Sequence, residues 1–187
     1  MRRVVACLAT VLLVVALPAA AAAPATCMGM PVTQPVGTNG DDTITGTSGP
    51  DVINARDGDD TISPAEGDDV VCGDAGNDTF VFSAGNDRLN GGPGDDDIEG
   101  GIGDDNLDGH EDNDKLEAGK GNDFLSGGPG NDILRGEQGN DTLLAGEGDD
   151  LLLGGAGSDT VNGGPGIDTC VDEDPGTVFR NCETINP

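Results

Sequence analysis

The stretch GGPGDDDIEGGIGDDNLDG, residues 91–109, repeats one nine-residue pattern of glycine, aspartate and a single apolar side chain. The same register extends from this stretch in both directions, and the residues from Gly37 to Val171 divide into fifteen nonapeptides without an insertion or deletion. A fixed short period over so much of a chain is typical of a solenoid, in which each repeat packs only on its neighbours.

Three positions define the nonapeptide, whose consensus is G-G-x-G-(D/N)-D-x-(apolar)-x. The fourth residue is Gly in every repeat except the ninth, where Asp112 replaces it. The eighth residue is always apolar, from Ile44 in the first repeat to Cys170 in the last. The sixth residue is Asp in every repeat, and these candidate metal ligands are Asp42, Asp51, Asp60, Asp69, Asp78, Asp87, Asp96, Asp105, Asp114, Asp123, Asp132, Asp141, Asp150, Asp159 and Asp168.

Each position has a physical reason. Glycines at the first, second and fourth positions permit positive φ, so carbonyl oxygens can converge around a turn. The sixth-position Asp adds a hard carboxylate oxygen, and Ca²⁺ takes about six to eight oxygens. We expect the seventh to ninth residues to form a very short strand in which only the eighth side chain points inward. Two repeats then complete one flattened coil, so that repeat i stacks on repeat i+2 and their two aspartates share an ion.

This pattern resembles the RTX, or haemolysin-type, calcium-binding repeat. The resemblance implies an all-β fold, a right-handed parallel β-roll, with Ca²⁺ held in the turns by backbone carbonyls and the sixth-position aspartates. Pairing each repeat with the next but one offers at most about 13 sites of this kind. Some turns depart from the consensus and are less suited to an ion; the departures are Asp112 at a fourth position, Pro50 and Ile167 at fifth positions, and Pro64 and Phe82 at first positions.

Composition predicts that the fold depends on metal. The chain carries 8 Lys and Arg against 36 Asp and Glu, a formal net charge of −28, which repels nucleic acid and anionic membranes and favours calcium ions as partners. The inward side chains alone bury too little apolar surface to offset the backbone entropy of the repeats. We therefore expect a disordered chain without Ca²⁺ and folding when several ions bind.

The ends of the chain indicate secretion. Residues 1–22 have the basic start, the apolar run and the small residues of a secretory signal peptide. The apolar run, residues 4–17, is shorter than the roughly twenty residues that a membrane-spanning helix requires. We expect a signal peptide at 1–22, an N-terminal cap segment at 23–36, the calcium-binding roll at 37–171 and a C-terminal disulfide cap at 172–187. The predicted location is extracellular.

Four cysteines follow the predicted signal peptide: Cys27, Cys72, Cys170 and Cys182. An even number in a secreted chain favours two disulfides, and three connectivities are possible. We favour Cys170–Cys182, which closes a short loop at the end of the roll, and Cys27–Cys72, which ties the N-terminal segment to the outer side of repeat four. Both bridges would cap exposed ends of the solenoid.

The sequence predicts a calcium-binding protein that is not an enzyme. The segment 23–36 is too short for a catalytic domain. EF-hand loops are excluded, because the loops that start at Asp95 and Asp104 carry Asn106 and Lys115 where a bidentate Glu belongs. The alternative function is a calcium-loaded cell-surface adhesin or matrix interaction module.

Outward positions late in the repeats offer a candidate surface for a protein partner or for self-association. The apolar residues at these positions are Phe124 and Leu144 in even repeats and Ile133, Leu151 and Leu153 in odd repeats. Such residues are equally consistent with the scattered apolar side chains that most protein surfaces carry. The sequence leaves both readings open.

Overall fold

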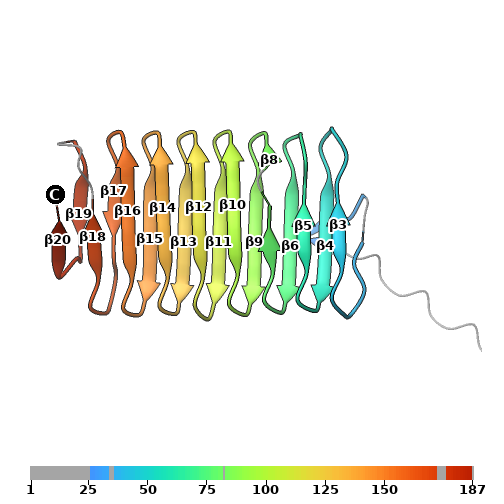
Figure 1. Ribbon diagram of the computed structural model, residues 1–187, viewed down its shortest axis with the longest axis horizontal. Helices are drawn as coiled ribbons and strands as arrows, with labels where there is room; N and C mark the ends of the chain where they lie inside the picture. Colours follow the sequence, from blue (N-terminus) through green and yellow to red (C-terminus); the bar gives the residue numbers. More distant parts are fainter. Residues whose placement is uncertain (1–25, 34–35, 82, 172–175, 187) are drawn as a thin grey trace, which may run out of the picture.

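The computed structural model describes residues 26–33, 36–81, 83–171 and 176–186, and within them every regular element is a β-strand. Figure 1 shows flattened coils stacked along one axis, with β3 and β4 toward one end and β19 and β20 at the other. The described residues contain no helix that is long and apolar enough to cross a membrane. The predicted signal peptide lies outside them.

Two parallel sheets form the roll. One sheet carries the strands that begin in odd repeats, together with β8 in repeat six and β20 near the C-terminus. Its strands are β3 (Thr43–Thr45), β5 (Thr61–Ser63), β7 (Thr79–Phe80), β8 (Ser83–Ala84), β10 (Asp97–Ile102), β12 (Lys115–Lys120), β14 (Ile133–Gln138), β16 (Leu151–Ala156), β18 (Thr169–Val171) and β20 (Thr184–Asn186). The other carries β4 (Val52–Asp57), β6 (Val70–Ala75), β9 (Arg88–Pro93), β11 (Asn106–Glu111), β13 (Phe124–Pro129), β15 (Thr142–Glu147), β17 (Thr160–Asn162) and β19 (Val178–Arg180).

Strand pairing confirms that repeat i stacks on repeat i+2. Ile98 in β10 pairs with Leu116 in β12, and Leu107 in β11 pairs with Leu125 in β13. Both pairs are 18 residues apart, so one coil contains two nonapeptides. Consecutive repeats therefore contribute to opposite sheets, and their turns lie along the two opposite edges of the roll.

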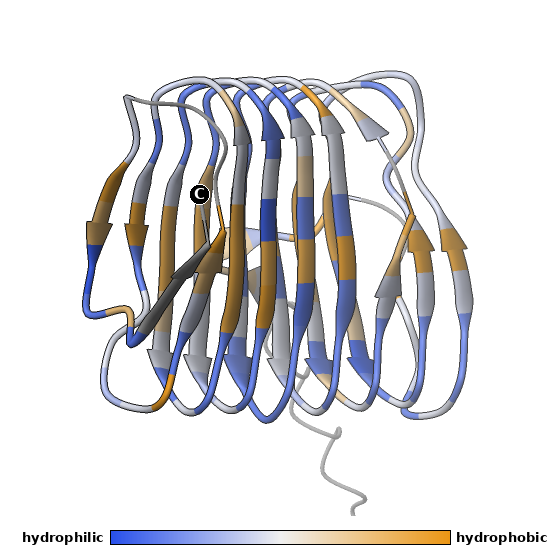
Figure 2. Cartoon of the chain, turned by 60° about the vertical axis from the view of Figure 1, so that its left-hand side comes forward, coloured by the Kyte–Doolittle hydropathy of each residue, from blue (hydrophilic) through white to orange (hydrophobic). Residues whose placement is uncertain are grey.

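The core is a file of apolar side chains between the two sheets. Every eighth-position residue is buried, from Ile44 at one end to Cys170 at the other. In Figure 2 the hydrophobic colour lies mainly along the strands, while most of the turns at the two edges are blue to white. This confirms the predicted inward position.

The prediction that only the eighth residue points inward is wrong for most repeats. Strands in the middle of the roll have six residues and continue into the first three positions of the next repeat, as in β10 and β12. Alternation along this longer strand turns the first position inward as well. In three repeats the first-position residue is a buried alanine, namely Ala55, Ala118 and Ala145.

Disulfides join the predicted pairs of cysteines. Cys27 is bonded to Cys72 and Cys170 to Cys182, with Cα atoms 5.7 and 5.9 Å apart. Cys27 belongs to a short antiparallel pair, β1 (Thr26–Cys27) with β2 (Met30–Pro31), which the first bridge attaches to β6. The N-terminal segment is therefore held against the outer face of the sheet of even repeats.

The C-terminal segment extends the roll beyond the last nonapeptide. Val161 pairs with Phe179 at the usual spacing of 18 residues, which adds β19 to one sheet. Thr169 pairs with Thr184, only 15 residues later, which adds β20 to the other. Strand pairing thus continues past Val171, where the sequence repeats end, and the final coil is three residues shorter.

Candidate metal centre

The sixth-position aspartates form two continuous rows, one along each edge of the roll. In each row the main-chain N–H of one Asp donates to Oδ1 of the Asp two repeats later, as from Asp78 to Asp96 at 2.8 Å and from Asp87 to Asp105 at 2.8 Å. Equivalent hydrogen bonds link the other members, from Asp42 and Asp51 to Asp159 and Asp168. The first oxygen of each carboxylate therefore fixes the side chain in the turn.

The second oxygen, Oδ2, has no hydrogen-bond donor in most of these residues. A buried carboxylate oxygen without a partner is costly, because it has lost water and gained nothing in exchange. Repetition along both edges makes this cost a property of the whole fold. The residues concerned are Asp60, Asp69, Asp78, Asp96, Asp105, Asp114, Asp123, Asp132, Asp141, Asp150 and Asp168.

In the turns of Asp78, Asp105, Asp132, Asp141 and Asp168, this oxygen faces a main-chain carbonyl across a space that a methyl group on the first-position glycine would fill. A methyl group on Gly73 would lie 2.1 Å from Oδ2 of Asp78 and 2.6 Å from the carbonyl oxygen of Gly91. A methyl group on Gly136 would lie 2.4 Å from Oδ2 of Asp141 and 2.5 Å from the carbonyl oxygen of Gly154. First-position glycine thus leaves a small cradle lined by oxygens that carry negative charge.

Electrostatics at these positions disfavour the bare carboxylate. Burial, together with the neighbouring charges of Asp114 and Asp78, raises the pKa of Asp96 to about 8, although the hydrogen bond from the main chain of Asp78 lowers it. Burial likewise raises the pKa of Asp105 and of Asp114 to about 7. A row of crowded anions with raised pKa values requires either protons or a bound cation.

The donors available in the cradle fit Ca²⁺. Carboxylate and carbonyl oxygens are hard ligands of the kind that Ca²⁺ prefers, whereas Zn²⁺ is bound mainly by Cys and His. Among the described residues, no three Asp, Glu, His or Cys side chains converge as a metal-binding group. An ion held here must therefore take part of its coordination from the main chain, which the glycine-rich turns supply.

Three members of the rows differ, because a hydroxyl group occupies the second oxygen. Thr38 donates to Oδ2 of Asp42 at 2.8 Å and Thr47 donates to Oδ2 of Asp51 at 2.9 Å. The hydroxyl of Ser83 donates to Oδ2 of Asp87. The consensus shows Asp at these positions as in every other repeat and so does not reveal this difference.

The C-terminal segment supplies an oxygen to the end of each row. The N–H of Asp159 lies 3.2 Å from the hydroxyl oxygen of Thr177, and the N–H of Asp168 donates to a carboxylate oxygen of Glu183 at 2.8 Å. Thr177 and Glu183 thus replace the Asp of a further repeat. Sequence reasoning missed both, because neither lies in a nonapeptide.

A second set of side chains, at the fifth position, also links the turns. The N–H of Asn77 donates to Oδ1 of Asp59 at 2.9 Å, and the N–H of Asp95 donates to Oδ1 of Asn77 at 3.1 Å. These bonds run toward the N-terminus, whereas those of the sixth position run toward the C-terminus. We call this series of hydrogen bonds the fifth-position ladder. The preference for Asp or Asn at the fifth position is the sequence feature that could have predicted it.

The departures from the consensus affect the turns unequally. Asp112 keeps the turn of repeat nine with φ of 78°, in the left-handed region that favours glycine. Ile167 still donates its N–H to Asp149 at 2.9 Å but has no side-chain oxygen for the fifth-position ladder. Pro50 lacks both the N–H and the oxygen. Phe82 lies outside the described residues.

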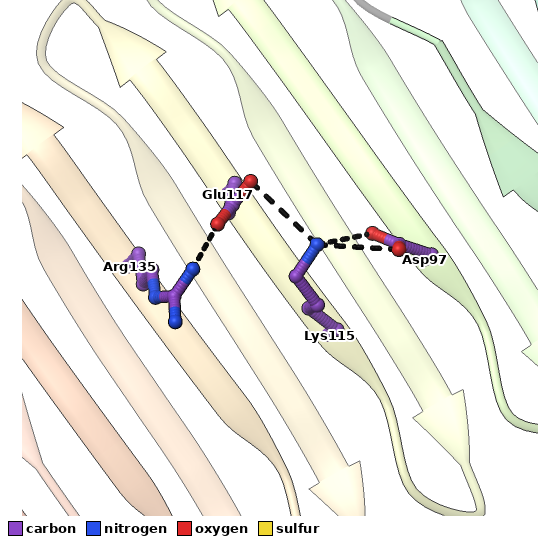
Figure 3. Close-up of polar contacts among 4 residues, drawn as sticks. All are labelled: Asp97, Lys115, Glu117 and Arg135. Atoms are coloured by element: carbon purple, nitrogen blue, oxygen red, sulfur yellow. Dashed lines mark hydrogen bonds and ion pairs between the residues drawn. The ribbon is translucent and has the colours of Figure 1, made fainter.

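The outer face of the odd-repeat sheet holds two of the basic residues in ion pairs, drawn in Figure 3. Lys115 lies 2.9 Å from Asp97 and 3.6 Å from Glu117, and Arg135 also pairs with Glu117. Such partly exposed pairs contribute little stability. They do, however, hold two of the basic side chains on the outer face of the sheet, where they pair with Asp97 and Glu117 and not with the aspartate rows.

Stacked parallel coils with oxygen-lined turns define a cation-binding β-solenoid. The family model described as the RTX calcium-binding nonapeptide repeat (4 copies) matches residues 36–71, 65–80, 72–107, 83–116, 108–143 and 135–170. The chain therefore belongs to the RTX calcium-binding repeat family, and its parallel β-roll is the fold that the sequence predicts. Comparison with curated proteins gave no match.

Proposed function

We propose that this chain is a secreted protein that folds by binding several Ca²⁺ ions and has no catalytic domain. RTX repeats bind calcium, so calcium binding follows from membership of the family. The observation that supports the rest is the row of buried Oδ2 atoms without donors along each edge, several of which lie beside a main-chain carbonyl. A bound ion gives these oxygens the partner that the protein does not supply.

The sixth-position aspartates would hold the ions together with first-position carbonyl groups. The Ca²⁺ supplies positive charge and oxygen coordination between stacked coils. The chain positions the ligands: glycine admits the close approach, and the bond from the preceding Asp in the row fixes each carboxylate. Because a cradle needs two coils in contact, the unfolded chain has no complete site, and binding free energy becomes folding free energy.

Net charge supports this coupling between binding and folding. The formal charge of −28 opposes compaction, and the paired cations on the outer face do not reach the edges. Loss of residues 1–22 would remove Arg2 and Arg3 and make the chain more negative still. Divalent ions along both edges would remove most of this repulsion, which permits the compact state.

Several features support an extracellular location. Residues 1–22 have the pattern of a signal peptide. One disulfide lies toward each end of the roll, and disulfides are usual in oxidising compartments. Extracellular calcium modules typically bind at about 10⁻⁴–10⁻³ M. Such affinities keep the chain unfolded in the cytoplasm and folded outside.

An adhesin or matrix interaction module is the second candidate function. On the odd-repeat sheet, Ile133 pairs with Leu151 and Leu153 pairs with Val171, which makes one half-buried apolar patch on the outer face. On the other sheet, Phe124 pairs with Thr142 and Leu144 pairs with Ser126, so these two apolar residues are not directly opposite. The patch on the odd-repeat sheet is thus the better candidate for a partner.

Folding measured with and without calcium tests the proposal. We expect the far-UV circular dichroism of the chain beginning at residue 23 to be that of a disordered chain in chelator and β-rich in millimolar Ca²⁺. Size-exclusion chromatography is expected to show a smaller hydrodynamic radius when calcium is added. Identical spectra and radii in both conditions would overturn calcium-driven folding.

A further inference from the structure

Ser83 provides a hydroxyl donor to the carboxylate oxygen that has no donor in most other turns. Its side chain is buried, donates its hydroxyl hydrogen to Oδ2 of Asp87, and places Oγ 3.1 Å from the carbonyl oxygen of Gly100. In repeat five, the corresponding carboxylate of Asp78 faces the carbonyl of Gly91 with no protein donor between them. The hydroxyl of Ser83 thus stands between the same two kinds of oxygen.

The backbone of this turn also differs from its neighbours. The second-position residue has positive φ in twelve repeats, whether it is Gly or another residue such as Arg56, His110 or Glu137. The second-position residues without positive φ are Thr38, Thr47 and Ser83, the same three whose hydroxyl groups bind the sixth-position Asp. Backbone and side chain therefore distinguish the same three turns.

We propose that the turns of repeats one, two and six are closed by a side-chain hydroxyl in place of a calcium ion. Asp42, Asp51 and Asp87 then serve as structural acceptors, although the sequence groups them with the calcium ligands. Repeats one and two form the first coil, so their hydroxyl groups begin both rows without metal. Ser83 lies within the roll and interrupts the row of even repeats between Asp69 and Asp105.

This inference rests on the proposed function, because it states which turns leave calcium unbound in a protein that binds several ions. It assigns a role to the second position of the nonapeptide. Thr or Ser there, with its backbone outside the left-handed region, fills the cradle with a hydroxyl group. The other residue types found there adopt positive φ, and the cradle stays open for an ion.

A pair of matched substitutions in one row tests the proposal. In Asp87→Asn, the amide oxygen can accept the N–H of Asp69, and the amide nitrogen can donate to Ser83, which then donates to the carbonyl of Gly100 at 3.1 Å. The variant is expected to bind as many Ca²⁺ ions as the unmodified protein. Asp105→Asn, one step along the row, removes a charged ligand without such a replacement and is expected to lower the count by at least one ion.

Equilibrium dialysis followed by metal analysis gives the number of ions per chain, and circular dichroism in calcium reports whether each variant is folded. If Asp105→Asn does not fold, Asp141→Asn in the same row takes its place, because Gly136 leaves an open space between Oδ2 of Asp141 and the carbonyl of Gly154. Loss of an ion from Asp87→Asn, or failure of this variant to fold in calcium, overturns the proposal. So does an unchanged count in Asp105→Asn, because the two turns would then be equivalent. If the unmodified protein binds no calcium, the proposed function fails as well.

Discussion

The main-chain nitrogen of Asp78 lies 2.8 Å from Oδ1 of Asp96, its equivalent two repeats later. The next Asp in sequence, Asp87, belongs to the row on the opposite edge, where it is hydrogen-bonded to Asp69 and Asp105. One hydrogen bond thus joins each turn to the coil that follows. Because Oδ1 is used in this bond, Oδ2 remains for a cation, and the site exists only when two coils are stacked. The geometry couples each site to its neighbours.

Coupling of neighbouring sites predicts a cooperative calcium titration. Binding at one cradle orders two coils and thereby completes half of the next cradle, so we expect a sigmoidal folding curve with Hill coefficient above 1. Mg²⁺ is expected to be a poor substitute, because it is smaller and loses its hydration water reluctantly. Circular dichroism during titration with each ion measures this. A hyperbolic calcium curve would show that the sites fill independently.

Position along the row determines the cost of losing an aspartate. Asp105→Ala leaves the N–H of Asp87 without its acceptor and removes a buried ligand from the middle of the roll. We expect this change to lower the free energy of unfolding in calcium by about 1–3 kcal/mol from the unpaired N–H alone, with the loss of a bound ion in addition. Asp42→Ala is the control.

Asp42 begins its row and is only partly buried, and its second oxygen is bound by Thr38. Its loss is expected to cost less stability than the loss of Asp105. Chemical denaturation at a fixed calcium concentration compares the two variants. Equal losses of stability would contradict the idea that central aspartates serve two stacked coils.

The fourth-position glycine of repeat twelve, Gly139, is expected to tolerate no side chain. Gly139 has φ of 146°, and a methyl group there would lie 1.4 Å from the carbonyl oxygen of Gly121. We expect Gly139→Ala to destabilise the calcium-loaded roll by about 3 kcal/mol or more. Gly49 holds the same position in repeat two, but a methyl group there meets no atom within 4 Å. Gly49→Ala should change stability by less than about 0.5 kcal/mol, and similar thermal shifts for the two variants would refute this reading.

The sequence predicts the features that every repeat shares. The unbroken period places the sixth-position aspartates on the two edges and the eighth residues in the core, and the even number of cysteines after the predicted signal peptide indicates two bridges. The period does not show where a strand ends. Alternation crosses the repeat boundary, which is why the first position, as at Ala118, is also buried.

The consensus does not predict features that belong to a single repeat. The inward hydroxyl of Ser83 depends on the φ of its own backbone, and a consensus treats its residue as one variable position among fifteen. Glu183 reaches the row only because the last coil is three residues shorter than the others. Local backbone geometry decides both, and a nine-residue period carries no information about it.

Proton binding should replace calcium in part, which predicts an unusual pH dependence in chelator. Burial raises the pKa of Asp96 to about 8 and those of Asp105 and Asp114 to about 7, whereas an unfolded Asp titrates near pH 3.9. A raised folded-state pKa means that the folded chain binds more protons. Its contribution to stability is complete below about pH 4 and is lost as pH rises through about 7–8.

We therefore expect the metal-free chain to gain β-structure on acidification from about pH 8 to about pH 4, and to lose it when the pH is raised again. Asp96→Asn is the matched control, since its amide resembles the neutral carboxyl group and can still accept the N–H of Asp78. This variant should need less acid to fold in chelator. In calcium the direction reverses, because protons compete with Ca²⁺ for the same oxygens, so apparent calcium affinity should fall as pH decreases. Far-UV circular dichroism across this range, with chelator and with calcium, measures both effects. A metal-free chain whose spectrum does not change with pH would show that the buried carboxyl groups do not control folding.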